Sequence, residues 1–416
     1  MSPSLSRRSV LGLGAAGLAG ATAWAIENAV SSGAVTPVTR AAAPARTRDL
    51  PEIQHDTAAF VAPAVTENGV AFQFGPAYTL LLTAQLTRTP TAADQATFAA
   101  ALAAVEGHWP FSDAGVMTAV AYGRPYLDRL PSGVVAGHMP RLRADPSRPA
   151  FEEATPQPTD VAPGNGITKR TFNIPVVIES NDLLLTLRGD TLTDVVAAGD
   201  FLFGAKPLPG TSTGSGMAPL LRPTSSRLIT NVRGLPRLLA NASNRMYVER
   251  VNPQSRLWMG FDDHQIGSDA PADITTFAGS DLARLTTAVP GDYLALASVV
   301  HLSHVILDLD QYYLPDVNNP TDSEAGYTKR VQYMFRASDP PPLGGADQFT
   351  NGGGTTFVAN PFVGTENAVA GAKGVRVPDR TPRLGHVSTL QRVSRTKDGT
   401  PLHIRIVGAG FDAIDT

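Results

Sequence analysis

Hydrophobic and polar positions in the first half of the chain follow two periods, one of strands and one of helices. Short runs that are mostly apolar predict β-strands, and between them Ala, Leu, Phe and Val recur at helical spacing. Strands are predicted over residues 78–86, 116–122, 181–188 and 227–232, and helices over residues 92–105 and 191–203. Thr91 is a residue type that caps a helix N-terminus. Strand, helix and strand therefore follow one another twice, and two such halves in one sheet predict a ferredoxin-like α+β unit.

The second half of the chain is less regular, and a second unit is expected to begin near residues 245–251. Residues 338–380 are rich in Pro, Gly and Asn, which predicts a long insertion over one face of that unit. The segment 304–313 has helical spacing, but its alternation of apolar and acidic residues also suits a strand. The remaining expected elements are strands at 293–301 and 402–407 and a helix at 323–335.

Composition restricts the class of protein. A chain of 416 residues can form two domains with substantial cores. Its hydrophobic fraction of 43% and aromatic fraction of 7% are typical of a globular protein, and its formal net charge of −3 argues against a nucleic-acid partner. The chain has no cysteine, which excludes disulfides, thiolate metal sites and a cysteine nucleophile.

The N-terminal segment predicts export. Arg7 and Arg8 form a twin-arginine pattern, and a Gly- and Ala-rich apolar run over 11–26 follows it. This arrangement is typical of a signal peptide of the twin-arginine route, predicted over residues 1–30. A membrane anchor is the alternative, but the run is short and weakly hydrophobic for a spanning helix of about 20 residues. The protein is therefore expected outside the cytoplasm, without stable membrane insertion once the signal is cleaved.

The domain boundaries follow from these patterns. Residues 31–50 are rich in Ala, Pro and Thr without periodicity, which indicates a linker. Two folded regions come after it, over residues 51–240 and 241–416. Cleavage after Ala23 and cleavage nearer Ala43 both remain open, and so does the oligomeric state.

Two short motifs in the second region carry candidate chemistry. The sequence GFDD runs from Gly260 to Asp263 and is followed by His264. Further along, His386 follows a Gly and precedes a polar, Arg-rich segment that ends in the strand predicted at 402–407. Arg405 lies in the middle of that strand, on the face opposite its neighbouring isoleucines. His386 and Arg405 could therefore face one cavity from opposite walls.

With these motifs the chain resembles the dye-decolorising (DyP-type) haem peroxidases. That family has a Gly-x-x-Asp-Gly motif, then a His that ligates haem iron, then an Arg on the distal side. A Tyr-x-Asp-Arg segment at 126–129 and an Asp-Leu-Leu run at 182–184 are also similar to the family. The resemblance implies two ferredoxin-like domains, the second of them binding haem. It also implies further elements after Thr416, so either the chain is shortened or its second domain is incomplete.

The resemblance assigns a role to each site residue. His386 would ligate the iron of haem b, with Gly260 and Phe261 beside the cofactor. Asp263 would move a proton between the oxygens of hydrogen peroxide, and Arg405 would stabilise negative charge on the departing oxygen. The expected activity is reduction of hydrogen peroxide with oxidation of small aromatic donors.

One position departs from the family pattern, because His264 stands where the family has Gly. A bulky residue there would push Asp263 out of line or narrow the distal space, since Gly in such a turn usually marks close approach to a ligand. Alternatively, His264 could itself act as an acid or base. The competing interpretations are an exported protein of the same fold that binds porphyrin or no cofactor, and a metal-independent barrel enzyme. His301 and His304 also have the i, i+3 spacing of a metal pair on a helix, although no third ligand is evident.

Overall fold

The structure is a computed structural model of the whole chain. It describes residues 62–63, 65–67, 70–72, 75–143, 145–151, 179–251, 253, 256–259, 275–278, 286–305, 307–314 and 408–411. The predicted signal peptide and linker lie outside these residues, as do the insertion predicted at 338–380, the helix at 323–335 and the strand at 402–407.

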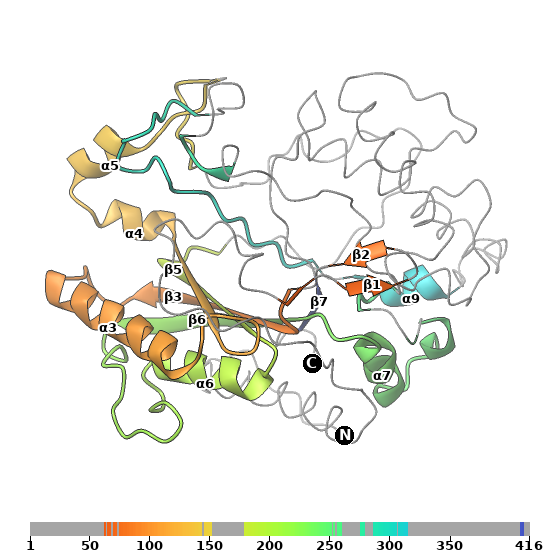
Figure 1. Ribbon diagram of the computed structural model, residues 1–416. Helices are drawn as coiled ribbons and strands as arrows, with labels where there is room; N and C mark the ends of the chain where they lie inside the picture. Colours follow the sequence, from red (N-terminus) through yellow and green to blue (C-terminus); the bar gives the residue numbers. More distant parts are fainter. Residues whose placement is uncertain are drawn as a thin grey trace, which may run out of the picture.

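The described chain is a mixed α/β structure (Figure 1). Its elements are, in chain order, β1 Val65–Glu67, β2 Val70–Phe72, β3 Tyr78–Leu86, α3 Ala92–His108, β4 Met117–Tyr122, α4 Arg124–Asp128, α5 Ser132–His138, β5 Leu183–Gly189, α6 Leu192–Leu202, β6 Leu221–Thr230, α7 Leu235–Ala242, the 3₁₀ helix η3 Val248–Arg250, α9 Leu309–Tyr313 and β7 Ala409–Phe411.

Five of the strands form one antiparallel sheet in the order β4-β5-β3-β6-β7. Apart from the short helices α4 and α5 between β4 and β5, the chain order is β3-α3-β4-β5-α6-β6, which is the β-α-β-β-α-β connection expected from the sequence. β3 lies in the middle of the sheet, and all but one of its nine residues are buried. β1 and β2 form a separate two-stranded sheet.

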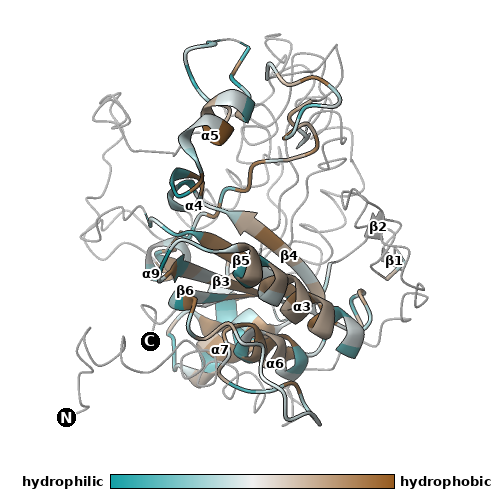
Figure 2. Cartoon of the chain, turned by 90° about the vertical axis from the view of Figure 1, so that its left-hand side faces the viewer, coloured by the Kyte–Doolittle hydropathy of each residue, from teal (hydrophilic) through white to brown (hydrophobic). Residues whose placement is uncertain are grey.

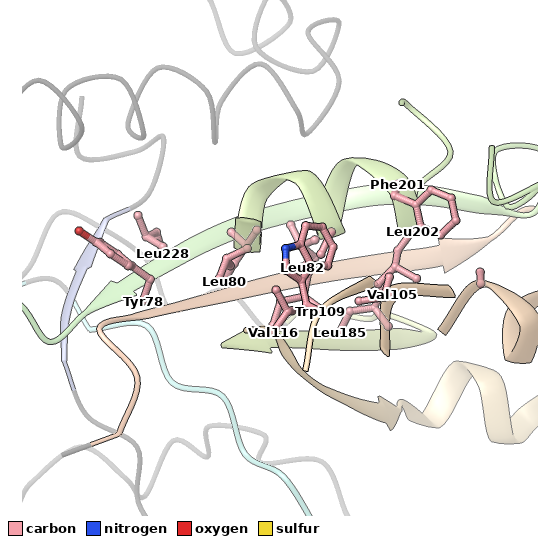
Figure 3. Close-up of a cluster of buried hydrophobic side chains, with 14 of the residues drawn as sticks. Tyr78, Leu80, Leu82, Val105, Trp109, Val116, Leu185, Phe201, Leu202 and Leu228 are labelled. Carbon is pink, nitrogen blue, oxygen red and sulfur yellow. The ribbon is translucent and has the colours of Figure 1, made fainter. Parts of the chain in front are cut away.

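The two faces of the sheet differ in chemistry because side chains alternate along each strand. Leu80 and Leu82 of β3 point towards α6, together with Leu185 and Leu187 of β5 (Figure 3). Both α3 and α6 lie on this side of the sheet, and Figure 2 shows hydrophobic segments where the strands lie beside α3. Neither α3 nor α6 lies on the opposite side, which we call the helix-free face with reference to the described helices alone; it carries Thr79, Leu81 and Thr83 of β3.

Close packing between α6 and the sheet depends on Gly199. A Cβ atom at this position would lie 2.9 Å from Cδ1 of Leu82, which is closer than real Cβ contacts allow. Phe201 and Leu202 then complete the core from the helix, and they are 3% and 0% exposed. Apolar area removed from water in this way is the main source of stability for a unit of this size, at about 25 cal/mol per Å².

The N-terminus of α3 is fixed by the capping residue that the sequence predicts. The Thr91 hydroxyl accepts a hydrogen bond from the Asp94 backbone N–H, and the Asp94 carboxylate accepts one from the Thr91 backbone N–H. This reciprocal pair is a capping box. Arg88 also donates to the Asp94 carboxylate, and this hydrogen bond together with those from Thr91 holds the Asp94 pKa well below its usual range.

Most elements predicted in the first half are confirmed, and β3 has the predicted bounds. β6 begins six residues earlier than expected, at Leu221, because Pro223 and the polar residues after it conceal the strand period. The pairing of β3 with β6 shifts its register between Thr83 and Ala84, opposite this part of β6. Proline lacks an N–H donor and is tolerated in a strand at such an irregularity.

One expectation for the second half is wrong, and another is confirmed only in part. The segment 293–301 is not a strand, because turns that begin at Gly291, with φ of 97°, continue through Asp292 and Leu294. Among the described residues, Ala295 and Ala297 alone in this segment accept backbone hydrogen bonds from another segment, at residues 277–278. The helix expected at 304–313 is limited to α9. Among the described helices, none has the length and apolar composition that crossing a bilayer requires.

Candidate functional site

The residues to which the resemblance assigns a site lie outside the described residues: Gly260, Phe261, Asp263, His264, His386 and Arg405. The structure does describe the chain immediately before the first of them and shortly after the last. It also describes the helix-free face of the sheet, which carries polar and charged side chains of its own.

A hydrogen bond joins the two chain segments that flank the predicted motifs. The indole Nε1 of Trp258 donates to the carbonyl oxygen of Gly410 at 3.3 Å, across 152 positions of sequence. Trp258 stands two positions before Gly260, and Gly410 stands five positions after Arg405. The structure thus brings together the described ends of the segments that contain GFDD and Arg405.

The neighbours of Trp258, Leu257 and Met259, pack against a second hydrophobic cluster that includes Tyr247 and Tyr313. The carbonyl oxygen of Trp258 accepts a hydrogen bond of 2.8 Å from the hydroxyl of Tyr313, which is fully buried. The Tyr313 ring stacks on Tyr247, with 5.1 Å between the ring centroids and 16° between the planes. The guanidinium of Arg250 donates to the carbonyl oxygen of Tyr313. The segment before GFDD is therefore held by this packing and by two hydrogen bonds of one residue, Trp258.

Gly410 is held by the sheet. Its strand β7 pairs antiparallel with β6, with Ala409 opposite Thr230 and Gly410 opposite Ile229. Ala409 is 1% exposed, and its carbonyl oxygen accepts a further hydrogen bond of 3.4 Å from the Thr230 hydroxyl. The end of the segment that contains Arg405 is consequently an edge strand of the sheet formed by the first half of the chain (Figure 1).

Hydroxyl groups line one part of the helix-free face. The hydroxyl of Thr83 on β3 is hydrogen-bonded to the hydroxyls of Ser225 and Thr224 on β6. Thr224 also donates to the side-chain oxygen of Asn181 at 2.6 Å. Buried polar groups of this kind remain only where they have partners. The network therefore holds the irregular start of β6 against the centre of the sheet.

The carboxylate of Glu179 belongs to the same network and forms an ion pair with Arg227 of β6. Burial alone would raise the pKa of Glu179. The hydrogen bond and charge of Arg227, with hydrogen bonds from Asn181 and Ser225, hold that pKa below its usual value instead. The carboxylate is therefore a stable anion, and it neutralises one of the arginines on this face.

Arg188 of β5 lies on the helix-free face opposite Thr79 of β3 and Met117 of β4. Its Nε donates to the Thr79 hydroxyl at 3.3 Å. In the described part of the chain, no carboxylate pairs with this guanidinium and no acceptor faces its two Nη nitrogens. Burial lowers the pKa of Arg188 below its ordinary value. Among the described residues this half-buried cation has no compensating anion, which is unusual because an unpaired buried charge is costly.

The histidine pair considered as a metal site does not have the geometry expected of it. His301 and His304 lie in a segment without helical structure, and the Nε2 atom of His301 is 2.8 Å from the hydroxyl of Ser303. Within the described ranges, no three His, Asp or Glu side chains gather closely enough to hold a metal ion.

Comparison with known proteins identifies a family. Residues 76–405 match the family described as "Family of unknown function (DUF7405)". The chain belongs to this family. The matched region of this family member begins just before β3 and ends at Arg405, so it includes β3 to β6 of the sheet and the two motifs, but not β7. No curated protein and no solved structure matches the chain.

Sequence reasoning did not identify Arg188 or Glu179 as candidate functional residues. A signal for Arg188 was present, because it is the one charged residue in the run LLLTLR, in phase with Thr186 and out of phase with Leu185 and Leu187. Strand alternation alone places it on the opposite side from the core. Glu179 carried no such signal, because it precedes the strand and meets Arg227 only through the sheet topology.

Proposed function

We propose that this protein is an exported haem peroxidase, similar to the DyP type, that reduces hydrogen peroxide and oxidises small aromatic donors. The observation that carries the proposal is the hydrogen bond between Trp258 and Gly410. In the DyP-type arrangement, the Asp of the first motif and the later Arg serve one side of the haem. A structure that joins the flanks of the two motifs supports a shared site for Asp263 and Arg405.

The proposal extends to the fold. The observed β-α-β-β-α-β unit, with both helices on one side of the sheet, has the connection of a ferredoxin-like domain. We propose that it is the first of two such domains, over residues 51–240, and that residues 241–416 form the second, which binds haem. The resemblance supports the second domain.

The chemistry of the donor set fits haem b. The imidazole of His386 supplies a neutral nitrogen of the kind that ligates haem iron, and the chain has no cysteine that could replace it. Haem, when bound, supplies the redox chemistry of the reaction. The Asp263 carboxylate would carry a proton from one peroxide oxygen to the other as general acid and base. The guanidinium of Arg405 would stabilise the negative charge that develops on the departing oxygen. Gly260 and Phe261 would contact the cofactor.

A second candidate function rests on His264, which stands where the family motif has Gly. In this alternative the protein keeps the fold and the export signal but has lost catalysis, and it binds porphyrin or no cofactor. Two measurements distinguish the candidates. An absorption band at roughly 400 nm shows that a porphyrin is bound. Turnover of hydrogen peroxide by that protein then separates a peroxidase from a protein that binds porphyrin without catalysis.

Substitution of His386 by Ala tests the site. We expect bound haem to fall sharply while the protein remains folded, because the ligand stabilises only the haem-bound state. The matched control is His301→Ala, which removes an exposed histidine hydrogen-bonded to Ser303 and should leave haem content unchanged. Arg405→Leu should keep haem but slow its reaction with peroxide by on the order of 10² to 10³.

Haem content by absorbance and peroxide reaction by stopped flow decide the outcome. Retention of a full haem spectrum in the His386→Ala protein would show that another residue holds the iron. A wild-type protein that takes up no haem would favour the second candidate function.

A further inference from the structure

We propose that the helix-free face of the sheet holds a binding site for the carboxylate group of a small organic molecule, centred on Arg188. This inference goes beyond the haem proposal and does not rest on it. All the residues that carry it belong to the described first half of the chain, on β3, β4, β5 and the segment before β3.

Neighbouring strands and the loop before β3 fix the position of the Arg188 guanidinium. Arg188 sits near the end of β5, between its cross-strand neighbours Thr79 and Met117, which are 3% and 4% exposed. The backbone of Gly75 lies against the guanidinium, since a Cβ atom at Gly75 would be 2.4 Å from Nη2 of Arg188. A side chain at position 75 would fill this space. The guanidinium therefore lies where the loop before β3 has left room for it.

The Nη nitrogens of Arg188 form no hydrogen bond to a described residue, and this favours a ligand that accepts hydrogen bonds from both of them. The Arg188 Nε is used by the Thr79 hydroxyl, and within the described residues the two Nη nitrogens have no acceptor. These two nitrogens form the end of the planar fork that binds a carboxylate with two parallel hydrogen bonds. An exposed arginine would satisfy its donors with water, but Arg188 is only partly accessible. Burial of a cation without an anion is costly, which favours binding of an oxyanion here.

The rest of the face indicates an organic ligand. Leu184 and Thr186 precede Arg188 at alternate positions of β5, and both are partly exposed. Ala119 of β4 lies opposite Thr186 and is exposed, so a small side chain leaves this part of the face accessible. A ligand with its carboxylate at Arg188 can place an apolar body over these residues. Arg227 does not compete for the carboxylate, because it already pairs with Glu179.

Benzoate is a suitable probe, and benzamide is its neutral counterpart of the same shape. Isothermal titration calorimetry of the full mature protein, at constant ionic strength, should show that benzoate binds and that benzamide binds much more weakly. Arg188→Gln should weaken benzoate binding about tenfold to a hundredfold, because a hydrogen bond to a charged group is worth about 1.5–3 kcal/mol. Arg188→Lys keeps the charge but loses the two parallel donors of the guanidinium. Its affinity for benzoate should lie between those of wild type and Arg188→Gln.

Two further variants guard against indirect effects. Gly75→Ala should weaken benzoate binding because its Cβ displaces the end of the Arg188 side chain, and a flexible side chain can move without unfolding the protein. This variant decides the question if Arg188→Gln does not fold. Arg222→Gln is the matched control, because Arg222 lies exposed on the same face and reaches Gln85. It should bind benzoate within about twofold of wild type, since an exposed charge acts weakly across solvent.

The outcomes are distinct. Benzoate binding that depends on Arg188 and survives in the His386→Ala protein supports the site and separates it from any haem pocket. Equal affinity of wild type for benzoate and benzamide would overturn it, as would equal affinity of wild type and Arg188→Gln for benzoate. Absence of benzoate binding up to about 10 mM would also overturn it. If Arg188→Gln lowers stability and benzoate has no effect on either protein, Arg188 pairs with a carboxylate of this chain and the proposal is wrong.

Discussion

Replacing Arg129 by Met should destabilise the protein more than replacing Asp182 by Asn, although the two side chains form one ion pair. Arg129 follows α4 and Asp182 precedes β5, so the pair joins the two segments in which the chain resembles the DyP family outside the haem motifs. The Arg129 Nε is 2.8 Å from Oδ1 of Asp182, and its Nη2 is 3.2 Å from Oδ2. Oδ2 also accepts a hydrogen bond of 2.7 Å from the backbone N–H of Leu86.

The difference follows from burial. The Asp182 side chain is 1% exposed, whereas the Arg129 side chain is 29% exposed. Without Arg129, the buried carboxylate keeps only the Leu86 N–H, and loss of one partner of a buried pair costs about 3–5 kcal/mol. Without the Asp182 charge, Arg129 can turn towards water, and Asn keeps an acceptor for Leu86. The second variant should therefore cost about 1–3 kcal/mol, the range for lost charged hydrogen bonds.

Urea denaturation, with the slope m required to stay constant, measures both changes in the free energy of unfolding. A double-mutant cycle should give a coupling of at least about 1 kcal/mol between the two positions. Arg124→Met in helix α4 is the control, because Arg124 and Asp128 are 4.0 Å apart and more than half exposed. It should cost under about 0.5 kcal/mol. If Arg129→Met costs no more than this control, or less than Asp182→Asn, the burial reasoning is refuted.

Two further predictions concern residues outside the described ranges. If the protein binds haem, His264→Gly should raise peroxide turnover at equal haem content, because it restores the family motif beside Asp263; steady-state assays in which turnover is unchanged or lower would show that His264 is neutral or useful. Replacing Arg7 and Arg8 by Lys should block export, because the arginine pair is the signal of the twin-arginine route, and undiminished protein in the exported fraction would count against that route.

The sequence predicts the sheet best at its two most regular strands. β3 and β5 are dense in Leu and β-branched residues, and turn residues mark their ends, so their bounds were close to those predicted. The first residues of β6 were not predicted as strand, because their side chains bind Thr83 and Glu179 in a polar network and do not pack in the core. A polar network has no sequence period, because its partners come from strands that are far apart in the chain.

The segment 293–301 was predicted as a strand but is not one in the structure. Its run of Leu, Val and Ala suggests a strand, but backbone turns after Gly291 leave Leu296, Val299 and Val300 about half exposed. Apolar composition alone does not make a strand, since a strand also requires a neighbour that pairs with its backbone along its length. Within the described residues, only Phe277 and Ala278 donate backbone hydrogen bonds to it, at Ala297 and Ala295.

The candidate site shows what motifs and topology each contribute. Motif spacing can name Asp263, His386 and Arg405 as a set, but it cannot predict that β7 adds to the edge of a sheet built from the first half of the chain. That pairing, with the Trp258 hydrogen bond to Gly410, is what makes one shared site for the two motifs physically reasonable. For Arg188 the structure contributes more than the motifs do. The sheet topology places its charge on the helix-free face, and no sequence motif includes it. The haem and carboxylate proposals therefore depend on different residues, and failure of either experiment leaves the other unaffected.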